Sequence, residues 1–137
     1  MGKDKLIAFA RWILFIPGAF MCCYVVSWFV RAFPEVIERM DLGFTTLSVF
    51  LANLFNSCIW GASFSISGLW IAPKKNVAVN NVLAIVVVVW GIFVGFTTIY
   101  FDNIGIWGII SMIIFLFAQL FGSIIGGLMY LDEINKN

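Results

Sequence analysis

The chain has 137 residues, of which 63% are hydrophobic and 11% are charged, and its formal net charge is +1. Soluble domains are about 45–50% apolar and about 25% charged. This composition excludes a soluble enzyme and a disordered chain, because too few polar residues are present to face water. It also excludes a nucleic-acid-binding protein, which would need a strongly basic surface. A membrane protein remains.

Four long runs of the chain carry no Asp, Glu, Lys or Arg, and they cover residues 12–30, 42–73, 76–101 and 103–131. A helix rises about 1.5 Å per residue, so about 20 apolar residues cross the hydrocarbon core of a bilayer. The runs lack the alternating polarity that is typical of membrane barrel strands. The sequence therefore predicts an all-α integral membrane bundle of four transmembrane helices, forming a single membrane domain.

The first predicted span covers residues 12–30, and Pro17 can bend it because proline lacks a backbone N–H. In the connection that follows, Pro34 suits the first position of a helix and Gly43 suits a helix end. Charged and apolar residues between them recur at helical spacing. We therefore expect a short amphipathic helix near residues 34–42 that lies on the membrane surface.

The other predicted spans cover residues 46–71, 79–101 and 105–131. Their connections are short, with a Pro-Lys-Lys-Asn turn at 73–76 and an Asp-Asn-Ile-Gly turn at 102–105. Turns of this length force consecutive spans to run antiparallel and side by side.

The distribution of Lys and Arg predicts the orientation of the bundle, because loops rich in these residues stay in the cytoplasm. Six of the eight basic residues fall on the face that carries both termini: Lys3, Lys5, Arg11, Lys74, Lys75 and Lys136. Only Arg31 and Arg39 fall on the other face. We expect a protein of the inner or plasma membrane with both termini in the cytoplasm.

Small residues at four-residue spacing form a candidate helix-packing interface, because they let helix backbones approach closely. This interface consists of Gly91, Gly95, Ala118, Gly122 and Gly126. Two uses remain open at this point. The stripes can serve packing inside one bundle, or docking on a second copy or on another membrane protein.

Polar side chains inside the spans form a second candidate set, which consists of Asn53, Asn56, Ser57 and Gln119. Carboxamides in lipid are costly unless they are hydrogen-bonded, so these side chains should point inward. They serve either as interhelical hydrogen bonds or as the polar lining of a path for a solute.

Two tryptophans, Trp60 and Trp90, fall near the predicted membrane midplane rather than at a span end. An indole there needs an acceptor for its N–H, and Asn56, one turn from Trp60, is the candidate. The default role of both rings is to fill the core, and the alternative is to form the wall of a cavity.

Chemistry-bearing groups are scarce. The chain has no His, and no charged residue lies deep inside a predicted span. Cys22, Cys23 and Cys58 fall within spans and have no base beside them in sequence. We therefore predict no catalytic, metal-binding or cofactor-binding residues, and a protein that is not an enzyme.

Two functional hypotheses follow. The first is a non-enzymatic accessory, regulatory or immunity-type subunit that docks its helices on a larger membrane protein or on copies of itself. The second is a homo-oligomeric channel or passive carrier, whose path the polar face of the second span would line. In both, the lipid bilayer surrounds the chain and nucleic acid is not a partner.

Overall fold

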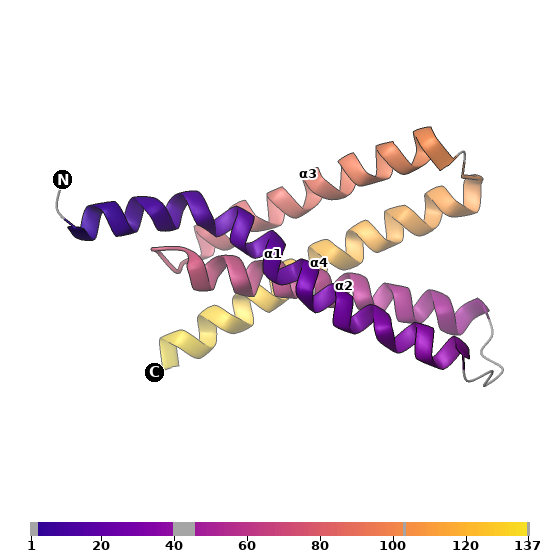
Figure 1. The fold of residues 1–137 in the computed structure, drawn as a ribbon, viewed down its shortest axis with the longest axis horizontal. Helices are drawn as coiled ribbons and strands as arrows, with labels where there is room; N and C mark the ends of the chain where they lie inside the picture. The colour runs from indigo at the N-terminus through magenta and orange to yellow at the C-terminus, as the bar shows by residue number, and fades with distance from the viewer. Residues whose placement is uncertain (1–2, 40–45, 103, 137) are drawn as a thin grey trace.

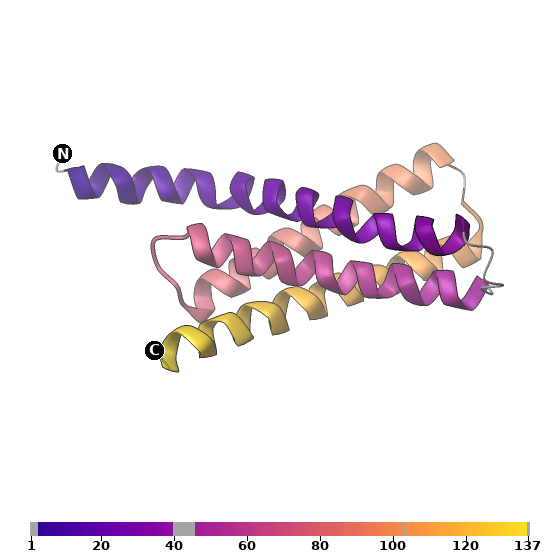
Figure 2. The same ribbon diagram turned by 60° about the horizontal axis from the view of Figure 1, so that its bottom comes forward.

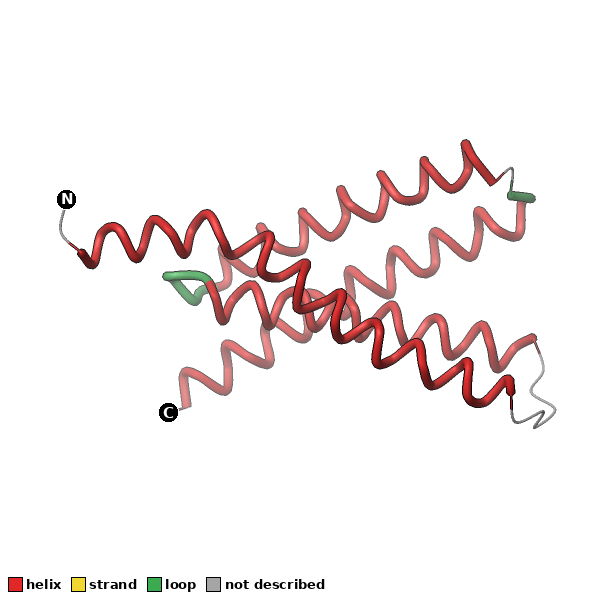
Figure 3. Tube along the Cα trace, viewed as in Figure 1, coloured by secondary structure: helices red, strands yellow, loops and turns green. Residues whose placement is uncertain are grey.

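The computed structural model describes residues 3–39, 46–102 and 104–136. Within these residues the chain forms four long helices and no strand (Figures 1 and 3). The helices are α1 (Lys3–Arg39), α2 (Thr46–Ile71), α3 (Val77–Asp102) and α4 (Ile106–Lys136). Each contains a stretch that is long and apolar enough to cross a membrane. The prediction of an all-α chain with four candidate spans is confirmed.

The separate surface helix expected near residues 34–42 is not formed as predicted. Residues 34–39 are the last turns of α1, which runs without interruption from Lys3 to Arg39, and residues 40–42 lie outside the described part of the chain. No glycine stands between Val30 and Pro34 to end the helix. A proline inside a helix removes one backbone hydrogen bond, and the helix can continue past it.

The helix α1 is much longer than a bilayer core is thick. Its 37 residues correspond to about 55 Å, against a core of about 30 Å. Figure 1 shows that α1 bends in its first half, which contains Pro17, and that its N-terminal turns extend beyond the end of α2. This helix must therefore tilt or project from a membrane that contains the bundle.

Both termini and the turn between α2 and α3 lie at one end of the molecule, which we call the terminal end (Figures 1 and 2). In the turn, the side-chain oxygen of Asn76 accepts a hydrogen bond from the Val79 backbone N–H at 2.9 Å, so Asn76 is the N-cap of α3. The Lys75 ammonium lies 5.8 Å from the Tyr130 ring centroid and joins this turn to α4.

The helix α2 is central, since it packs against each of the other three helices. Its closest approach is to α4, where glycines face backbone. A Cβ placed on Gly61 would lie 1.9 Å from the Gln119 carbonyl oxygen, and one on Gly122 would lie 2.1 Å from the Cys58 carbonyl oxygen. Only glycine fits at these two positions, and they set the distance between α2 and α4.

The core lies in the half of the bundle near the terminal end. Its fully buried apolar side chains come from three helices and are Ala19, Cys23, Phe64, Leu69, Leu83 and Val87. One buried polar contact crosses this half, between the hydroxyls of Ser65 and Ser123, which are 2.6 Å apart. This core is closely packed, and a smaller, open pocket of about 260 Å³ lies beside it at the terminal end, with Trp12, Lys74 and Val82 among its lining residues.

Candidate functional site

A cavity of about 770 Å³ lies in the other half of the bundle, away from the terminal end. All four helices contribute to its walls: residues 24–28 of α1, 53–60 of α2, 90–99 of α3 and 109–119 of α4 each include lining positions. In Figure 1, α1 and α3 diverge as they run away from the terminal end. The cavity is partly open rather than enclosed.

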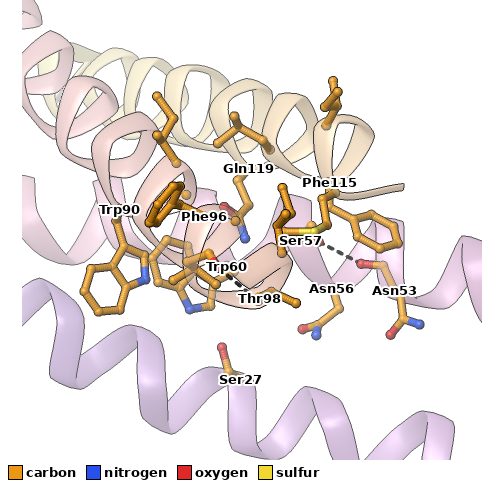
Figure 4. Close-up of a pocket in the computed structure, with 18 of the residues that line it drawn as sticks. Ser27, Asn53, Asn56, Ser57, Trp60, Trp90, Phe96, Thr98, Phe115 and Gln119 are labelled. Atoms are coloured by element: carbon orange, nitrogen blue, oxygen red, sulfur yellow. Dashed lines mark hydrogen bonds between the residues drawn. The ribbon is translucent and has the colours of Figure 1, made fainter. Parts of the chain in front are cut away.

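An aromatic layer closes the inner end of this cavity. The rings of Trp60 and Trp90 line it (Figure 4), and behind them lie Phe20 and Phe64. The Phe20 ring centroid lies 4.8 Å from that of Phe64 and 5.1 Å from that of Trp90. Beyond this layer begins the buried core, so the cavity has one closed end.

The polar groups of the cavity are carboxamides and hydroxyls. Two of the hydroxyls bond to their own helix: Ser57 Oγ donates to the Asn53 carbonyl at 2.9 Å, and Thr98 Oγ1 donates to the Val94 carbonyl at 2.9 Å. Figure 4 shows the side chains of Asn53, Asn56 and Gln119 around the same space. No Asp, Glu, Lys or Arg is among the described residues that line it.

Two buried oxygens of the lining, Ser27 Oγ and Asn56 Oδ1, have no hydrogen-bond partner among the described residues. Asn56 Oδ1 is the only acceptor of this side chain, so the hydrogen bond expected from the Trp60 indole to the Asn56 side chain is not formed. A buried polar atom without a partner costs about 1–3 kcal/mol. In Figure 4 the Ser27 hydroxyl points from α1 toward the α2 side of the cavity. Both atoms can accept a hydrogen bond from a molecule that enters.

The structure brings together most of the residues that the sequence analysis selected. The cavity lining includes the whole polar set, both midplane tryptophans and two of the small residues: Asn53, Asn56, Ser57, Gln119, Trp60, Trp90, Gly91 and Gly95. The two glycines lie opposite α4, where a Cβ on Gly91 would lie 2.2 Å from Leu116 Cδ1 and one on Gly95 would lie 3.2 Å from Met112 Cε.

The remaining small residues, Ala118, Gly122 and Gly126, lie apart from the cavity and are buried within the chain. A Cβ on Gly126 would lie 2.7 Å from the Cβ of Ala62 on α2. Of the two uses left open for this stripe, the structure places these three residues in packing inside one chain.

Four polar positions were not selected as candidate sites from the sequence: Tyr24, Ser27 and Thr98 of the cavity lining, and Asn80 outside it. Ser27 was not selected as part of the polar lining, since a serine in a run of apolar residues resembles any other small packing residue. Asn80 is 1% exposed, and its side-chain amide points at the Ile124 carbonyl at 3.4 Å. The sequence could have indicated Asn80, because a carboxamide in the first turns of a span needs a hydrogen-bond partner.

Comparisons of the chain with known protein families, with curated proteins and with solved structures gave no match.

Proposed function

We propose that this chain is a small multi-pass membrane protein that acts without catalysis, as an accessory, regulatory or immunity-type subunit. It binds a helix of a larger membrane protein, or of a second copy, along the rim of the cavity between α1 and α3. The observation that carries this proposal is the incomplete bundle: α1 packs chiefly on α2, and beyond the aromatic layer it separates from α3.

The rim of the cavity supports docking in this place. Trp28 on α1 and Phe96 on α3 line the cavity and are 69% and 68% exposed. Aromatic side chains with large exposed areas are the anchors that recur in protein–protein contacts. The carboxamides behind them offer hydrogen bonds to a partner, and such bonds between helices contribute about 0.6–2 kcal/mol each in a membrane.

The chemistry of the lining supports a binding role over a catalytic one. Acid–base catalysis requires a group that gains or loses a proton near the working pH. The carboxamides of Asn53, Asn56 and Gln119 do not ionise. The hydroxyls of Ser57 and Thr98 each donate to a backbone carbonyl, which is too weak a base to take the proton. These groups are suited to holding a partner rather than to transforming one.

The proposal includes an orientation in which the terminal end faces the cytoplasm. Three segments at this end carry basic residues (Figure 1). They are the first turns of α1 with Lys5 and Arg11, the turn between α2 and α3 with Lys74 and Lys75, and the last turn of α4 with Lys136. This arrangement agrees with the excess of basic residues in cytoplasmic loops. The cavity then lies in the outer half of the membrane.

Photo-crosslinking in native membranes tests the docking site. Benzoylphenylalanine is introduced at Phe96, on the rim, and in a matched variant at Phe93, which is 57% exposed on the same helix but outside the cavity lining. We expect Phe96→benzoylphenylalanine to give one defined protein adduct and Phe93→benzoylphenylalanine to give little of it. Equal protein adducts from both positions, or lipid adducts alone, would show that the rim is not a docking site.

A second candidate function is a homo-oligomeric channel or passive carrier. One observation favours it: Asn53, Asn56 and Ser57 of α2 share a single cavity with Gln119 of α4, as the lining of a polar path would require. The aromatic layer opposes it, since Trp60, Trp90 and the rings behind them separate the cavity from the terminal end.

A further inference from the structure

The interior of the cavity is too small for the helix that the proposed function places at its rim. A helix about 10 Å across, over half of a bilayer core or about 15 Å, occupies about 1,200 Å³. The cavity measures about 770 Å³, which is in the range of about 300–1,000 Å³ for small-molecule sites. The interior therefore has room for a smaller molecule, and the identity of that molecule is a question beyond the proposed function.

The charge of the walls indicates an uncharged occupant. The described lining residues include no Asp, Glu, Lys or Arg. A phosphate or ammonium group inside would lose its hydration shell without gaining a counter-ion from the described lining residues, which is strongly unfavourable. The part of the ligand that lies within the cavity is therefore neutral.

The walls offer acceptors beside the N–H donors of their carboxamides and indoles, so they suit an occupant with a group that both donates and accepts, such as a hydroxyl. The hydroxyl hydrogens of Ser57 and Thr98 are already donated to carbonyls of their own helices, which leaves these oxygens able only to accept. Ser27 Oγ and Asn56 Oδ1 are buried without a partner and can also accept. A free hydroxyl on the ligand would satisfy an acceptor of this set, whereas an ester or an ether oxygen would not.

The remaining walls are apolar and suit hydrocarbon. Trp60 and Trp90 close the inner end, Leu116 and Ile113 of α4 cover one side, and the exposed rings of Trp28 and Phe96 border the opening. A molecule with a hydroxylated head and chains that leave through the opening matches this distribution. We propose that the cavity binds the head of an uncharged, hydroxyl-bearing lipid of the diacylglycerol class.

Native mass spectrometry of the purified full-length chain tests this proposal. The protein is reconstituted in phosphatidylcholine nanodiscs that contain equal small fractions of dioleoylglycerol, its acetate ester and phosphatidylglycerol, and the lipids retained on release are counted. We expect one dioleoylglycerol per chain, retained about tenfold more than the acetate ester, because one hydrogen bond to a buried acceptor corresponds to roughly a factor of ten in affinity.

Variants locate the lipid. Asn56→Leu and Gln119→Leu should lower dioleoylglycerol retention about tenfold. Thr98→Val should lower it as well, whereas its neighbour Thr97→Val should not, because both hydroxyls bond to the Val94 carbonyl but only Thr98 lines the cavity.

Equal retention of the ester and the alcohol by the unmodified chain would overturn the proposal, and this comparison does not depend on the folding of any variant. Preferential retention of phosphatidylglycerol, or retention that none of the cavity variants alters, would overturn it too. Neither result bears on the protein adduct expected from Phe96 in native membranes, so the lipid site can fail while the docking site stands.

Discussion

Single residues determine how closely the helices of this bundle approach. At Gly61 and Gly122, the hydrogen of glycine faces a backbone carbonyl of the opposite helix, and any side chain would overlap with that carbonyl. Lipid tails are as apolar as the helices, so close packing of this kind contributes much of the attraction between helices in a membrane. The Ser65–Ser123 contact then adds a buried hydrogen bond to the same helix pair.

Gly61→Ala and Gly122→Ala should each lower the free energy of unfolding by about 1–3 kcal/mol, because the added methyl group forces α2 and α4 apart. The measurement is unfolding of the protein in dodecyl maltoside by added sodium dodecyl sulfate, followed by circular dichroism. Gly95→Ala, inside α3, is the control, since a Cβ there would lie 3.2 Å from Met112 Cε, the end of a flexible side chain that can move aside. A control variant as unstable as the other two would show that the α2–α4 crossing does not depend on these glycines.

At the scale of the element, the four helices could be predicted from the sequence because length and apolarity decide them. The absence of charge over 12–30 or 76–101 leaves a helix as the structure that satisfies the backbone in lipid. The end of α1 could not be predicted in the same way. Pro34 favours both the start of a new helix and a position inside a continuing one, and the choice depends on residues around it that carry no strong stop signal.

The start of α3 depends on one side chain. Asn76→Ala removes the acceptor for the Val79 N–H and should lower the free energy of unfolding by about 1 kcal/mol. The same detergent titration measures this change. Asn81→Ala, at an exposed position within α3, should have no effect or stabilise the helix slightly, because alanine has the higher helix propensity. Similar losses in both variants would mean that Asn76 does not cap α3.

At the scale of the whole molecule, one half of the bundle contains the buried core and the other half contains the cavity of about 770 Å³. The sequence identified half of the twelve polar and aromatic residues of the cavity lining, because carboxamides are costly in lipid wherever they point and an indole at the midplane needs an acceptor. These six residues are Asn53, Asn56, Ser57, Gln119, Trp60 and Trp90. The sequence could not decide between interhelical hydrogen bonds and a lining. That choice depends on the divergence of α1 from α3, which follows from how all four helices pack together.

The division of the bundle into these two halves favours binding of a molecule in the cavity over its transport across the membrane. A path across the membrane would have to pass the rings of Phe20, Trp60, Phe64 and Trp90, and then the buried core near the terminal end. Rings packed with centroids 4.8–6.2 Å apart leave no room for a solute between them. We therefore expect a molecule to enter the cavity and remain there rather than to pass to the other side.

The most direct test of this central claim is the permeability of liposomes that contain the purified chain, measured with water and with small uncharged solutes such as glycerol. We predict that liposomes with the chain have the same permeability as protein-free liposomes. A higher permeability that the double variant Asn53→Leu/Asn56→Leu lowers, and that Asn81→Leu leaves unchanged, would contradict it and would identify the cavity as part of a conducting path.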